Sequence, residues 1–168
     1  MRIIRNALLI LLALLLQTTW VDTIAVVGIK PDIVLLVLVY IGITEGQIEG
    51  TIFGFASGFL LDVYDPGAMG INSLCNSLVG FLVGYSHIGV VAEDFRVQTL
   101  LFFVATLFHD LIYFALYTFP KMQGFMHLFL VSGIGTAFYT AIAGLCLSLL
   151  FSIRFEEGIY LDARRLYG

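Results

Sequence analysis

Long apolar runs alternate with short polar links along the whole chain, and this pattern predicts a series of helices. The apolar stretches cover residues 7–16 and 24–29, then 33–43, 48–61, 71–91, 97–119 and 125–153. At 1.5 Å of helix per residue, the last three can cross about 30 Å of hydrocarbon, whereas 33–43 and 48–61 are short. Because 7–16 and 24–29 both belong to the first run, we expect about six transmembrane helices. The two short ones are either tilted or shielded full spans, or a re-entrant hairpin.

The composition agrees with a membrane protein. Hydrophobic residues make up 60% of the chain, charged residues only 12%, and the mean hydropathy is +1.02. Such a chain cannot hide its apolar surface inside a water-soluble globule. Since no Pro-, Gly- or Ser-rich linker interrupts it, the sequence predicts an all-α integral membrane protein, a single multi-pass bundle over residues 1–168.

Charge and chemistry exclude several classes of function. The net charge is −4, and the eight Lys and Arg residues form no continuous patch, which argues against nucleic acid and leaves the lipid bilayer and proteins as partners. Cys75 and Cys146 lie in apolar runs and are interpreted as packing residues. No metal-spaced histidine pair, serine elbow or phosphate loop occurs, so we expect no catalysis, no cofactor and no metal.

The distribution of positive charge predicts the orientation. With six crossings, one side collects six arginines and the other side only Lys30 and Lys121. By the positive-inside rule both termini are cytoplasmic, and the first apolar run is retained as an uncleaved anchor. The tail, residues 154–168, alternates charged and apolar residues, which fits either a short amphipathic cytoplasmic helix or a loosely ordered end.

Glycine recurs at every fourth position through the third helix, and Asp62 takes the next such place. Four helical glycines would each cost about 1 kcal/mol relative to alanine, so the pattern needs a compensating close contact. One alternative is an internal crossing, for which the small-residue stripe in residues 71–91 is the natural partner. The other is a groove that receives another protein or a ligand, with Asp62 at its outer mouth. The groove residues are Gly46, Gly50, Gly54 and Gly58.

Two other aspartates stand out. Pro31 and Asp32 precede the second run and predict a helix start there. Asp110 lies near the middle of an apolar span, where a carboxylate is costly and must face protein or water. His109 lies about 100° around the helix from Asp110, so we expect the two not to pair. Asp110 is either functional, as a proton relay, a ligand contact or a polar lock on a partner helix, or it is a protonated or hydrogen-bonded aspartate that holds one helix to its neighbour.

Several of these residues also carry a resemblance. The sequence resembles the family of bacterial rod shape-determining proteins called MreD, over about residues 30–84. One departure is Phe59, where the family usually has leucine. The matching features are Pro31-Asp32, Gly46-Gln-Ile-Glu-Gly50, Gly54-Phe-Ala-Ser-Gly58-Phe-Leu-Leu-Asp62, and Gly70 with Leu74.

The resemblance implies a non-enzymatic membrane adaptor of the cell-elongation machinery in the bacterial inner membrane, which helps regulate peptidoglycan synthesis. Its implied partners are MreC, a single-span protein with a periplasmic coiled coil, and further RodA with its transpeptidase and MreB filaments. We expect the glycine groove with Phe55 to receive the MreC transmembrane helix, and Asp62 or the outer turn to contact its periplasmic part.

The family also resembles, in architecture, the S component of energy-coupling-factor vitamin transporters. The alternative function is therefore a small-molecule-binding subunit of a vitamin transporter. Its polar contacts would be Asp110, Asn72, Asn76 and Tyr113. Structural or ligand roles are expected for Pro31, Asp32, Gly70 and Asp110.

Overall fold

The computed structural model describes residues 2–21, 23–26, 28–85 and 95–163, and, within these, the side chains except those of Phe95 and 150–163. The described residues contain helices and no β-strand, which confirms the all-α fold class. The helices are α1 (Arg2–Thr19), α2 (Ile33–Glu45), α3 (Gln47–Tyr64), α4 (Ile71–Tyr85), α5 (Phe95–Thr118), α6 (Phe125–Leu128) and α7 (Ile134–Ala163).

The last apolar run forms one continuous helical rod. α6 passes through a π-helical segment, η3 (Phe129–Gly133), directly into α7. α7 continues through Ala163, so the predicted tail is helical up to that residue, and its amphipathic character stays a prediction. Counted over the described residues, the rod and α1 to α5 give six helical segments, as the apolar runs predict.

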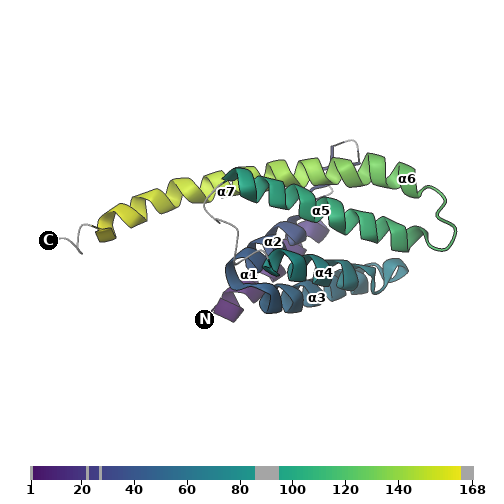
Figure 1. Ribbon diagram of the computed structural model, residues 1–168, viewed down its shortest axis with the longest axis horizontal. Coiled ribbons are helices and arrows are strands. Elements are labelled where there is room, and N and C mark those ends of the chain that lie inside the picture. The colour runs from purple at the N-terminus through teal and green to yellow at the C-terminus, as the bar shows by residue number, and fades with distance from the viewer. Residues whose placement is uncertain (1, 22, 27, 86–94, 164–168) are drawn as a thin grey trace.

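The helices run back and forth along one axis. Figure 1 shows α5 beside the α6–α7 rod in one layer and α1 to α4 in the other. The α3–α4 turn and the α5–α6 link lie at the right end, whereas the start of α1 and the end of α7 lie toward the left end. The first and last helices therefore begin and end on the same side of the bundle.

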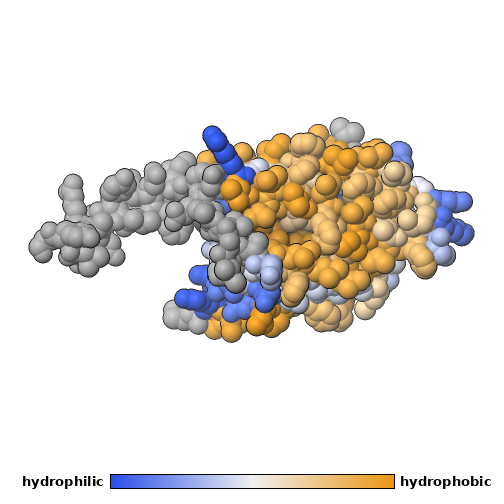
Figure 2. All heavy atoms as spheres, viewed as in Figure 1, coloured by the Kyte–Doolittle hydropathy of each residue, from blue (hydrophilic) through white to orange (hydrophobic). Residues whose placement is uncertain are grey.

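The protein is a membrane protein. Three of its described helical segments are long and apolar enough to cross a bilayer, namely Arg2–Thr19, Arg96–Thr118 and Phe125–Leu149. Large apolar side chains are exposed along these helices and along α3 and α4. Figure 2 shows them as a broad apolar band with polar residues gathered at its two ends. This distribution suits a bilayer, whose hydrocarbon meets the band and whose headgroups meet the ends.

The short helix α2 is shielded by the rest of the bundle. Eight of its 13 residues are buried, and α1, α3, α4 and α5 all contact it. It runs alongside α1: Ile33 N donates to Gln17 Oε1 (2.8 Å) at one end, and Glu45 pairs with Arg5 (2.8 Å) at the other. Because α2 follows α1 over most of its length, the structure favours a shielded span over a re-entrant hairpin.

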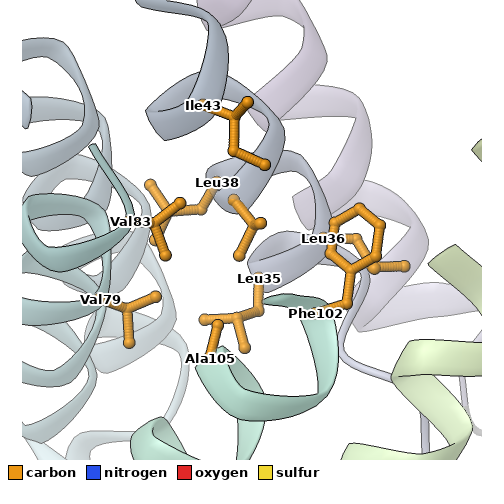
Figure 3. Packing of buried hydrophobic residues seen from close by; sticks show 9 residues of the cluster. Leu35, Leu36, Leu38, Ile43, Val79, Val83, Phe102 and Ala105 are labelled. Atoms are coloured by element: carbon orange, nitrogen blue, oxygen red, sulfur yellow. The ribbon is translucent and has the colours of Figure 1, made fainter. Parts of the chain in front are cut away.

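The main apolar core forms where α2 meets α4 and α5. Figure 3 shows Leu35 and Leu38 of α2 pointing toward Val79 and Val83 of α4, with Phe102 and Ala105 contributed by α5. A second cluster joins α2 to α1 through Ile10, Ala13 and Leu14. The uniformly apolar character of residues 33–43 follows from this position, since almost every face of α2 touches another helix.

The predicted helix start at Pro31-Asp32 is confirmed. Asp32 is the N-cap of α2, and its carboxylate accepts a hydrogen bond from Leu35 N (2.8 Å). Its own backbone N–H donates to Thr140 Oγ1 of α7 (2.9 Å), so α2 begins beside the middle of the α6–α7 rod. The turn after α3 also forms as predicted: Asp65 caps a short 3₁₀ turn, η1 (Pro66–Ala68), and Gly70 adopts φ +89° before α4.

Replacing the fully buried Leu38 with alanine should lower the thermal midpoint, whereas Leu12→Ala on the exposed face of α1 should not. Leu38 is 0% exposed and Leu12 is 55% exposed. Because lipid is as apolar as the core, the loss of stability comes mainly from the cavity that the substitution leaves. We therefore expect a loss of about 1–3 kcal/mol, at or below the low end of the range for soluble proteins. Thermal unfolding of the purified chains in one detergent measures the difference. Equal midpoints for both variants would contradict the assigned core.

Candidate functional site

The glycine face of α3 lies directly against the backbone of α4. A Cβ atom added at Gly50 would stand 2.5 Å from the carbonyl oxygen of Gly80, and one added at Gly54 would stand 2.7 Å from the carbonyl carbon of Asn76. At Gly58 the corresponding distance, to the carbonyl carbon of Asn72, is 2.5 Å. No side chain fits into such contacts. The predicted contact between these two helices is confirmed, and the groove is filled by α4 of the same chain.

Gly46 differs from the other glycines. It ends α2 and precedes α3 with φ +92°, a backbone conformation that residues other than glycine rarely adopt. The expectation that Gly46 continues the helical groove is wrong, because the chain turns sharply at this residue. It still joins the close contact, since a Cβ added at Gly84 would stand 2.6 Å from its carbonyl carbon.

Asp62 is buried inside the α3–α4 turn. Its side chain is 0% exposed and accepts hydrogen bonds from Asn72 N (3.0 Å), Ser73 N (2.9 Å) and the Ser73 hydroxyl. The expected position at an open groove mouth is therefore wrong. The carboxylate instead satisfies backbone donors in the first turn of α4 and meets the positive end of that helix dipole. Asp62 thus secures the hairpin whose glycines make the close contact.

The opposite face of α3 is apolar and has no partner among the described residues. Phe55 is 57% exposed and stacks on Phe59, with ring centroids 6.2 Å apart. Ile48 and Ile52 extend this face along the first turns of α3, and Phe81 of α4 lies beside them. A surface hollow lies there, lined by Gln47, Ile48, Thr51, Ile52 and Phe81. Of the predicted partner-binding residues, Phe55 is the one on this open surface.

His109 and Asp110 form a hydrogen-bonded pair inside the bundle, with His109 Nδ1 and Asp110 Oδ1 2.9 Å apart. The two residues are 5% and 8% exposed, so Asp110 faces inward as predicted. The expectation that the two do not pair is wrong. Their side chains leave the helix at different angles, but the aspartate is short enough for its oxygen to meet the near ring nitrogen of the adjacent residue.

The residues of the small-molecule alternative do not surround the hollow described above. Asn76 is 1% exposed and its Oδ1 has no hydrogen-bond partner, while Tyr113 stacks on His109 with ring centroids 6.0 Å apart. Neither these two nor Asn72 and Asp110 line the hollow. Within the part of the chain that the structure describes, no three His, Cys, Asp or Glu side chains are arranged to hold a metal ion.

A polar network at the terminal end of the bundle was missed from the sequence. Glu45 accepts from Arg5 (2.8 Å) and from Asn6 Nδ2 (3.4 Å), and Arg2 lies 3.8 Å from its other oxygen. Asn6 is 0% exposed although it stands in the first turns of an apolar helix. An asparagine between arginines and an apolar run was the available signal. The network ties α1 to the end of α2.

Comparison with known proteins gives the family. A family model described as rod shape-determining protein MreD matches residues 1–157. The chain belongs to the MreD family. No curated protein and no solved structure matches it.

The MreD match covers far more of the chain than the segment 30–84 that carried the resemblance. It includes the His109–Asp110 pair, the Glu45 network and most of α7. Membership in MreD gives the protein a role in rod shape determination, in a family that is not known for enzymatic activity.

The glycine contact can be tested with one methyl group. Gly54→Ala places a Cβ against the carbonyl group of Asn76, 2.7 Å from its carbon atom, and should separate the two helices, lowering the thermal midpoint by several degrees. Gly67→Ala is the matched control, since the nearest atom to its added Cβ is the flexible Asp65 side chain at 3.3 Å. Thermal unfolding in detergent measures both. Similar midpoints for the two variants would show that α3 and α4 are not in backbone contact.

Proposed function

We propose that this MreD protein is a non-enzymatic adaptor in the bacterial inner membrane that binds MreC and helps regulate peptidoglycan synthesis during elongation. Family membership gives the role in cell shape. The observation that carries the adaptor proposal is the α3–α4 hairpin, which is fixed by backbone contacts on one face and leaves an aromatic, apolar face open on the other.

The MreC transmembrane helix binds the open face of α3 and α4, with Phe55 and Phe59 as its central contacts. Aromatic side chains in well-packed positions carry much of the binding energy of protein interfaces. The glycines act indirectly in this proposal. By holding α4 against α3, they set the spacing of the exposed side chains on both helices. The proposal therefore keeps Phe55 as a partner contact and assigns Gly50, Gly54, Gly58 and Asp62 to the shape of the hairpin.

Both ends of the chain face the cytoplasm. This assignment is supported by the arginines at the terminal end of the bundle and by the start of α1 and the end of α7 on that side. MreB filaments then lie on the side of the Glu45 network. The α3–α4 turn and the α5–α6 link face the periplasm, where the folded part of MreC lies. RodA and its transpeptidase bind through the membrane face.

Phe55→Ala should weaken co-purification of MreC about tenfold or more, because it removes a central aromatic contact without touching the α3–α4 contact. Phe138→Ala is the matched control: Phe138 is 58% exposed and also packs against another ring, that of Phe103 (4.9 Å between centroids), but lies on α7. The measurement is the amount of MreC recovered with each variant from native membranes in mild detergent.

If Phe55→Ala binds MreC normally and Phe138→Ala loses it, the proposed site is wrong. MreC would then bind the other layer of the bundle, which contains α7. Gly54→Leu tests the indirect role of the glycines, which is to hold α4 against α3. It should insert into the membrane but unfold at a lower temperature and lose MreC, because the hairpin itself is disturbed.

The orientation predicts the behaviour of fusions. Green fluorescent protein attached to either end should fluoresce, since both ends are cytoplasmic, whereas alkaline phosphatase attached there should be inactive. An alkaline phosphatase inserted between Met122 and Gln123, in the exposed α5–α6 link, should be active. Active phosphatase at either terminus would reverse the proposed topology.

A further inference from the structure

The adaptor proposal leaves one buried group of titratable side chains unused. His109 and Asp110 lie within the span Arg96–Thr118, hydrogen-bonded to each other at 2.9 Å and almost fully buried. An ionisable pair at this depth is costly and is by default a candidate functional site. Histidine is also the side chain whose charge ordinarily changes between pH 5 and 8.

Neighbouring helices surround the pair closely. From the α6–α7 rod, the π-helical segment brings Gly133 so near that a Cβ added there would stand 3.4 Å from Asp110 Cβ. From α2, Asp32 at the N-cap is close enough for its charge to interact with both residues. π-helical segments within longer helices often mark functional positions.

The titratable and charged groups that face the pair come from three helices. Besides His109 and Asp110 themselves, they are Asp32 of α2, Cys75 of α4 and Tyr113 of α5. The rod contributes Gly133, which does not titrate. A proton on His109 would therefore have carboxyl groups from two helices near it, Asp110 on its own helix and Asp32 on α2.

Among the described residues, a file of aromatic side chains connects the pair with one end of the bundle. His109, Tyr113 and Tyr117 stack in a file along α5, with centroids 6.0 Å apart at each step, and Tyr117 is 54% exposed near the α5–α6 link. In the other direction, α5 continues into the main apolar core through Ala105 and Phe102. The file connects the pair with the exposed end of α5 through aromatic residues that carry hydroxyls. Toward the other end, the hydroxyl of buried Thr106 donates to Phe102 O (2.8 Å), and apolar side chains follow.

We propose that His109 and Asp110 form a proton-binding site that is reached from the α5–α6 end of the bundle and closed toward the other end. The ligand is a proton from the aqueous phase on that side. On binding it converts the hydrogen-bonded pair into an imidazolium–carboxylate pair between α2, α5 and the rod. This inference does not depend on MreC binding.

The test measures the protonation of His109 in the full chain. The NMR signals of the histidine ring nitrogens are recorded between pH 5 and pH 8 on histidine-labelled protein in detergent micelles. His109→Gln assigns the signal, and exposed His127 is an internal reference. Asp110→Asn should reduce the proton affinity of His109 about tenfold or more. Asp65→Asn, which removes an exposed carboxylate from the same end of the bundle, should change that affinity less than twofold.

A His109 ring that stays neutral over this whole pH range, or an Asp110→Asn effect no larger than that of Asp65→Asn, would overturn the site. If the Asp110→Asn chain does not fold, Asp32→Asn gives the second measurement, with an expected reduction of about threefold, and no reduction overturns the site. Closure at the other end predicts that vesicles containing the protein hold an imposed pH gradient as long as empty ones. A leak that His109→Gln abolishes would overturn the one-sided access.

Discussion

The close backbone contact between α3 and α4 is the constraint on which much of this structure depends. Apolar side chains gain little by leaving lipid for each other, so helices in a membrane associate through close approach and satisfied polar groups. Here both devices act on one hairpin. Glycines on α3 admit the α4 backbone, and Asp62 satisfies the donors at the start of α4. Together they form a rigid two-helix unit.

The rest of the bundle builds on that unit. Val79 and Val83 of α4 form one wall of the core that encloses α2, while Phe102 and Ala105 of α5 form another. Because other helices cover nearly every face of α2, a helix of only 13 residues can be stable there. Its N-cap also has a place inside the bundle, where Asp32 bonds both its own helix and Thr140. Backbone groups that lipid could not satisfy are satisfied by protein.

Packing also divides the polar residues of the bundle into three sites with separate roles. The Asp62 carboxylate accepts hydrogen bonds from Asn72 and Ser73 at the start of α4. Glu45 and the arginines of α1 close the terminal end of the bundle. The His109–Asp110 pair lies within the span Arg96–Thr118 and takes part in neither of these two networks. The outer face of α3 and α4, with Phe55, is apolar and offers a partner side chains instead of charges.

The sequence by itself determined the fold class, the number of helical segments, the start of α2 at Asp32 and the family, because these depend on local composition, caps and spacing. It also indicated that the glycines need a close neighbour. Only the tertiary structure decided which neighbour fills that face, since a stripe without side chains suits a helix of the same chain or of another. Burial likewise decided the position of Asp62, and side-chain reach decided the pairing of His109 with Asp110. Helical periodicity fixes the direction in which a side chain leaves the backbone, but not the position at which its polar atoms end or what packs against them.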